Sequence, residues 1–126
     1  MALAATLFVA LAISPGNEAV AQTFFDGMAS GDVEQIKLAD AVTFSGPLLN
    51  EPLSGKPAVS SFLDGVAAQL SITVEQTYLS ETGTCSEVTA RSASGIQTEE
   101  AICLDIQDGE VTSIRLYFDP RPFLED

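Results

Sequence analysis

The ionisable side chains of this chain allow only a narrow range of chemistry. The sequence contains no histidine, which excludes imidazole acid–base catalysis, histidine triads and histidine metal sites. Proton transfer would therefore depend on carboxylates, tyrosines, a lysine or a cysteine. The carboxylates and cysteines lack a metal-ligand spacing, and the glycines form no phosphate-binding loop. We therefore expect no metal and no other cofactor.

The two cysteines lie in successive strand-like segments that are joined by a tight loop. Ala93-Ser94-Gly95 matches a three-residue hairpin loop whose last residue needs a positive φ. This loop places Ser92 opposite Ile96 and, counting back, Cys85 opposite Cys103. Directly opposed residues of a non-hydrogen-bonded pair lie close enough to form a disulfide bond. The alternative is two reduced cysteines that are neighbours on the sheet surface.

The same hairpin register makes Glu100 the strongest catalytic candidate. It places Glu100 opposite Val88, on a strand face that it shares with Ile102 and Leu104. A carboxylate in apolar surroundings has a raised pKa and can act as an acid or base near neutral pH. The alternative is that Glu100 lies near the hairpin tip, where its side chain reaches water.

The apolar first thirteen residues resemble the core of a secretory signal. Residues 1–13 contain one polar side chain, Thr6, and are too short to span a bilayer. Ala10-Leu11-Ala12 resembles a cleavage site, but no positive charge precedes Lys37. The alternatives are an irregular start codon or an apolar tail that packs on the domain. A removed leader would predict a secreted or periplasmic protein, and a retained one a cytoplasmic protein.

Length and charge describe an acidic single domain. The chain has 126 residues, of which 46% are hydrophobic, and its formal net charge is −13. One domain, residues 14–126, accounts for this length. The negative charge repels phosphate backbones and anionic lipids, so we expect no nucleic-acid or membrane-surface partner.

Hydrophobic periodicity predicts helices first and strands afterwards. Apolar residues recur at helical spacing before Ser30-Gly31 and again after Lys56-Pro57, which predicts two helices. Between them, Asp32-x-x-Gln35 resembles a capping box and indicates a short helix. The period then changes to two, with Ile72, Val74, Gln76 and Tyr78 on one strand face. The expected strands are 41–45, 71–78, 84–92, 96–106 and 111–118, with Asp108-Gly109 as the last turn. This order predicts an α+β fold with helices on one face of an antiparallel sheet.

Four segments resemble the SnoaL-like branch of the nuclear-transport-factor-2-like superfamily, and the resemblance spans roughly residues 15–124. They are Phe24–Asp32, Val42–Pro47, Leu53–Val59 and Asp108–Pro120. The resemblance implies a cone, in which a curved antiparallel sheet wraps around about three N-terminal helices and a mostly apolar pocket. It also implies a homodimer formed through the outer sheet face. It does not define a reaction, because this fold hosts isomerases, cyclases, hydrolases and non-catalytic proteins.

The ketosteroid isomerases of this superfamily use a tyrosine, a general-base aspartate and a protonated carboxylic acid. The matching positions here are Phe24, Ser45 or Gly46, and Ile102, none of which supplies these groups. A ketosteroid-isomerase mechanism is therefore not expected.

The resemblance leaves three functional hypotheses. The preferred one is a protein that binds a small apolar molecule in a pocket formed by Phe24, Phe44, Phe62, Tyr78, Ile102, Leu104 and Phe118. The second is a carboxylate-dependent isomerase, cyclase or hydrolase of a lipophilic substrate that uses Glu100, and a burial-driven rise in the pKa of Glu100 would favour it. The third is a structural module whose cone is filled by its own side chains, which an absent cavity would favour. Arg115, on the last strand, is expected to pair with outer-face carboxylates such as Glu99 or Asp105.

Overall fold

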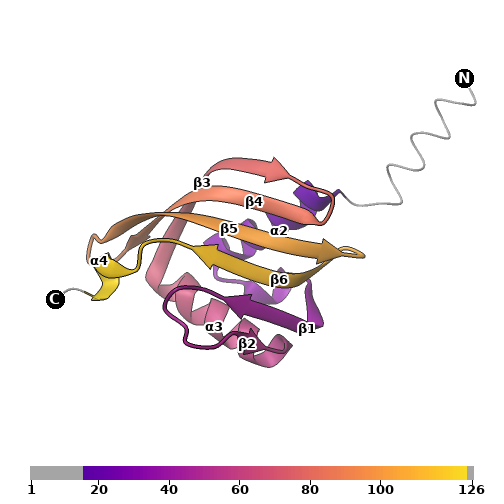
Figure 1. Cartoon of the computed structure of the whole chain (residues 1–126), viewed down its shortest axis with the longest axis horizontal. Helices are drawn as coiled ribbons and strands as arrows, with labels where there is room; N and C mark the ends of the chain where they lie inside the picture. The colour runs from indigo at the N-terminus through magenta and orange to yellow at the C-terminus, as the bar shows by residue number, and fades with distance from the viewer. Residues whose placement is uncertain (1–15, 125–126) are drawn as a thin grey trace, which may run out of the picture.

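A computed structural model describes residues 16–124, in which two main helices lie against one face of a curved six-stranded sheet (Figure 1). The predicted leader, residues 1–13, lies outside the described residues. Among residues 16–124, no helix is long and apolar enough to cross a membrane. The elements in chain order are α2 (Asn17–Ser30), η1 (Val33–Gln35), β1 (Leu38–Ser45), β2 (Leu53–Ser54), α3 (Lys56–Gln69), β3 (Leu70–Leu79), β4 (Gly83–Ser92), β5 (Gln97–Gln107), β6 (Glu110–Tyr117) and α4 (Arg121–Leu124).

The two long helices each bury one apolar stripe against the sheet. In α2, Phe24 and Met28 lie one turn apart and are buried in the core. The helix ends at Gly31, whose φ of 76° is the left-handed conformation that glycine adopts without steric cost. In α3, Val59 and Leu63 form the corresponding buried stripe. The amphipathic patterns therefore place both helices as predicted.

The predicted short helix after α2 is present, but it is shorter than an α-helix. Only a single 3₁₀ turn, η1, forms, and Asp32 makes no side-chain capping hydrogen bond. The strand begins at Leu38 rather than at residue 41, because Leu38 pairs with Val111 of β6. Pairing with β6 satisfies the backbone hydrogen-bonding groups of this segment as a strand, so the preceding helix cannot extend into it.

The sheet is mixed rather than wholly antiparallel, in the order β2-β1-β6-β5-β4-β3. Three successive antiparallel pairs join β3 to β6, and the last turn has positive φ at Asp108 and Gly109, 54° and 79°. In contrast, β1 pairs with β6 in parallel. No turn links these two strands, so the sequence contained no local signal for their relative direction.

The register of the β4–β5 hairpin is confirmed. The backbone N–H of Ser92 donates to the carbonyl of Ile96 at 2.8 Å, and Gly95 has a φ of 96°. Cys85 lies opposite Cys103, and the structure joins the two by a disulfide bond. This register therefore brings both cysteines to the outer face, which is the sheet face turned away from α2 and α3.

A bulge in β3 overturns the predicted alternation of that strand. Val74 lies opposite Val88, but the next pair is Gln76 with Glu87, so one extra residue is inserted between them. An inserted residue moves every following side chain to the other face. Tyr78 consequently lies opposite Cys85 on the outer face.

Candidate functional site

A cavity of about 460 Å³ lies between the inner face of the sheet and the helices. Side chains of α2, α3, β1, β3, β5 and β6 form its walls, together with the segment between β1 and β2 and the C-terminal residues. Its lining is almost entirely apolar. The lining residues are Phe24, Met28, Phe44, Gly46, Pro47, Leu48, Leu49, Ser61, Phe62, Leu63, Gly65, Val66, Gln69, Leu70, Ile72, Glu100, Ile102, Ile114, Leu116, Phe118 and Phe123.

Glu100 is the only ionisable side chain among these lining residues. It lies on β5 opposite Val88, as the hairpin register predicts, and is 8% exposed. The Thr98 hydroxyl donates a hydrogen bond of 2.6 Å to Oε2 of Glu100. Burial raises the pKa of the Glu100 carboxyl, and the Thr98 hydrogen bond opposes part of that rise. The carboxyl can therefore carry a proton under conditions in which an exposed glutamate is ionised.

Four predicted aromatic residues line the cavity. Phe24 comes from α2, Phe44 from β1 and Phe62 from α3, and Phe118 follows β6. The ring centroids of Phe44 and Phe62 lie 4.9 Å apart, so these two rings form one continuous wall. Ile102, two residues from Glu100 on the same face of β5, also lines the cavity, as expected.

Two residues of the expected pocket do not line it. The bulge turns Tyr78 outward, where it is 54% exposed and its hydroxyl donates to Glu87 Oε2 at 3.0 Å. Leu104 lies on the inner face of β5, as predicted. It is 1% exposed and packs within the hydrophobic core instead of lining the cavity. Alternation along a strand predicts which face of the sheet a side chain lies on. Whether that side chain lines the cavity or is packed in the core depends on which helix covers it.

Part of the cavity wall was not identified from the sequence. Pro47, Leu48 and Leu49 contribute from the segment between β1 and β2, and Phe123 contributes from α4. Leu48 is 50% exposed although it is a large apolar residue. Phe123 stacks edge-on against Phe118, with ring centroids 5.8 Å apart. The sequence marked the first segment only as a turn, because glycine and proline identify turns without showing what they contact.

The positions that match the ketosteroid-isomerase groups do border this cavity. Phe24, Gly46 and Ile102 all line it, and none of them has an ionisable side chain. Within residues 16–124, no group of three or more cysteine, aspartate or glutamate side chains is placed to hold a metal ion. The cavity can therefore accommodate an apolar molecule, and Glu100 can present one protonatable carboxyl group to that molecule.

Solved structures share this architecture at low sequence identity. A nuclear-transport-factor-2-like protein of unknown function from Cytophaga hutchinsonii superposes with a TM-score of 0.79 at 18% identity, covering 89% of this chain and 97% of its own. A protein assigned as a SnoaL-like polyketide cyclase from Jannaschia gives 0.76 at 14% identity, covering 89% and 91% of the two chains. One assigned as a ketosteroid isomerase from Kribbella flavida gives 0.73 at 18% identity, covering 82% and 77%.

No protein-family profile and no curated protein matches the chain. The structural matches confirm the nuclear-transport-factor-2-like α+β cone that the sequence resemblance implied. Proteins of this fold with different assigned activities match about equally well, so the fold does not identify a ligand or a reaction.

Proposed function

We propose that this chain binds a small, mostly apolar molecule in the cavity and that Glu100 contacts the polar group of that molecule. The observation that carries the proposal is one buried carboxyl in a mostly apolar cavity of about 460 Å³. This volume lies within the range of small-molecule sites, in which a few polar groups orient an apolar ligand.

The charge of the chain narrows the class of ligand. The net charge of −13 disfavours an anionic molecule. No lysine or arginine lines the cavity in the described part of the chain, so no local cation would offset this field. A neutral or cationic molecule with one hydroxyl, carbonyl or amine therefore fits the site best.

A second function is favoured by the raised pKa of Glu100. A buried carboxyl whose pKa is raised can hold a proton where an exposed glutamate has lost it, and can donate or accept that proton as a general acid or base. The alternative is therefore an isomerase, cyclase or hydrolase of a lipophilic substrate, in which Glu100 transfers the proton. This candidate needs the same cavity and the same residue as simple binding.

A thermal-shift screen against steroids, terpenoids and polyketide-like aromatics tests the proposal. A ligand that binds only the folded protein raises its melting temperature. We expect at least one compound to stabilise the wild-type protein, and its effect to decrease in Glu100→Gln, which keeps the size of the side chain. Glu99→Gln is the matched control, because Glu99 is the adjacent exposed carboxylate and should leave the effect unchanged.

The outcomes separate the two functions. Conversion of a stabilising compound by the wild-type protein and not by Glu100→Gln would support the enzyme. Binding without conversion would support the binding protein. Equal stabilisation of wild type and Glu100→Gln would contradict a role for Glu100 in either function.

A further inference from the structure

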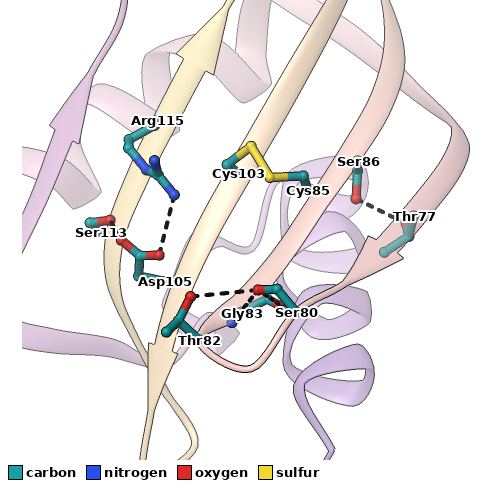
Figure 2. The surroundings of a disulfide bond; sticks show 10 residues. All are labelled: Thr77, Ser80, Thr82, Gly83, Cys85, Ser86, Cys103, Asp105, Ser113 and Arg115. Atoms are coloured by element: carbon teal, nitrogen blue, oxygen red, sulfur yellow. Dashed lines mark hydrogen bonds and ion pairs between the residues drawn. A yellow bond between two sulfur atoms is a disulfide. The ribbon is translucent and has the colours of Figure 1, made fainter.

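The outer face of the sheet carries a second chemical group, on the opposite side of the sheet from the cavity. The Cys85–Cys103 disulfide lies on this face, and the helices lie behind the sheet in the same view (Figure 2). The two cysteine residues are not equally exposed. Cys103 is 7% exposed, whereas Cys85 is half-buried. We therefore expect an external thiol to attack Cys85 rather than Cys103.

A cation lies on the strand next to Cys103. Arg115 of β6 is directly opposite Cys103, and its guanidinium lies next to that residue on the same face (Figure 2). Nη2 of Arg115 pairs with Oδ1 of Asp105 at 3.3 Å, as the sequence indicated. Ser113 donates to the other oxygen of Asp105 at 2.6 Å. These contacts hold the guanidinium between β5 and β6.

One donor of this guanidinium is unused. Nε of Arg115 is buried and makes no hydrogen bond to any residue in the described range 16–124. A buried donor without an acceptor is costly, and a thiolate is an acceptor for which Arg is a suitable partner. Opening of the disulfide would create such a thiolate at Cys103, the residue opposite Arg115.

We propose that the Cys85–Cys103 bond is a thiol–disulfide exchange site whose substrate is a neutral or cationic dithiol. A thiolate of the dithiol attacks Sγ of Cys85, and Sγ of Cys103 leaves as a thiolate stabilised by Arg115. The second thiol of the reductant then displaces Cys85 from the mixed disulfide. The dithiol becomes a disulfide, and the protein gains two electrons and, after protonation, two thiols.

The surrounding charges define the preferred thiol. A thiolate that displaces Cys103 approaches Cys85 from the side away from Cys103, which is the side of β3. On that side Tyr78 lies opposite Cys85, and its hydroxyl donates a hydrogen bond to Glu87. Glu99 and Asp105 lie on the same face of β5, and the whole chain carries a charge of −13. An anionic thiol is therefore repelled along this path.

Reduction of the folded protein by dithiothreitol tests the site. We expect Arg115→Gln to slow reduction on the order of three- to tenfold, because the departing thiolate loses its partner. Arg115→Lys, which keeps the charge, should restore much of the rate. Arg121→Gln is the matched control, since Arg121 is an exposed cation paired with Asp119 near the C-terminus, and it should react like the wild-type protein.

Trapped intermediates test the direction of attack. After reaction with cysteamine and an acid quench, peptide mapping should find the mixed disulfide on Cys85 and a free thiol at Cys103. The cationic thiol cysteamine should also reduce the protein faster than the anionic thiol 2-mercaptoethanesulfonate. Each rate is divided by the rate at which the same thiol reduces a small peptide disulfide. A mixed disulfide on Cys103, or equal rates for Arg115→Gln and wild type, would overturn the proposal.

A purely structural disulfide predicts a different result. Reduction would then occur only as fast as the protein unfolds and would accelerate with urea in parallel with unfolding. A second copy that covers the outer face would likewise block exchange at concentrations where a dimer forms. Either result would show that the bond is not an exchange site.

Discussion

At the scale of single residues, Glu100 combines two properties that rarely occur together. The residue is 8% exposed, yet within residues 16–124 its one side-chain partner is the hydroxyl of Thr98, which is also buried. A hydroxyl stabilises a carboxylate less than a cation would, so burial dominates and raises the pKa of Glu100. The folded protein therefore holds a proton on this group more tightly than the unfolded chain does.

This difference makes stability depend on pH. Between the ordinary glutamate pKa of 4.5 and the raised value, the folded state binds more protons than the unfolded state, so stability falls as pH rises. We expect the free energy of unfolding of the wild-type protein to decrease relative to that of Glu100→Gln as pH rises above 4.5. Urea unfolding at a series of pH values measures this, with Glu99→Gln as the control for the charge change. Parallel curves for wild type and Glu100→Gln would contradict the burial of an ionisable Glu100.

At the scale of elements, two glycines in the long helices have opposite surroundings. Gly65 lies within α3, and a β-carbon added there would meet no atom within 4 Å. Gly27 lies within α2, and its β-carbon would lie 2.7 Å from Cγ1 of Ile36 and 3.1 Å from the carbonyl oxygen of Asp32. One glycine only weakens its helix, whereas the other permits close packing of α2 on the turn that follows it.

The two alanine substitutions should therefore change stability in opposite directions. Gly65→Ala should raise the free energy of unfolding by about 1 kcal/mol, the gain in helix propensity. Gly27→Ala should lower it by roughly 1–2 kcal/mol, because the cost of overpacking exceeds that gain. Urea unfolding at one pH measures both. Stabilisation by Gly27→Ala would show that α2 packs less closely on Ile36 than the structure indicates.

At the scale of the whole molecule, the cavity and the disulfide occupy opposite faces of one sheet. Ile102 lines the cavity, and the adjacent Cys103 carries the disulfide on the other face of β5. The disulfide joins residues 18 apart in the sequence and so restricts the unfolded chain more than the folded one. Its removal should reduce global stability and leave the shape of the cavity intact.

The double variant Cys85→Ser, Cys103→Ser tests this separation. We expect its free energy of unfolding to be about 3 kcal/mol below that of the oxidised wild-type protein, as the chain-entropy estimate gives for a loop of this length. A compound that stabilises the wild-type protein should raise the melting temperature of the variant by a similar amount. Urea unfolding and the thermal-shift screen provide the two measurements. Loss of the ligand effect in a folded variant would show that the two faces are coupled.

The sequence by itself determined the features that depend on neighbouring residues. Helical spacing located α2 and α3, and the loop ending in Gly95 aligned Cys85 with Cys103 and Val88 with Glu100. A short loop leaves few ways for two strands to pair, so the register follows from local chemistry. For the same reason the side chain of Glu100 could be assigned to the inner face without the structure.

Only the tertiary structure decided the features that depend on distant residues. The parallel pairing of β1 with β6, the bulge that turns Tyr78 outward and the contribution of Phe123 to the cavity have no local signal. Each arises because strands and helices far apart in the chain compete to bury apolar surface, and the best solution depends on the whole core. The burial that raises the pKa of Glu100 likewise exists only after α2, α3 and the sheet have closed around it.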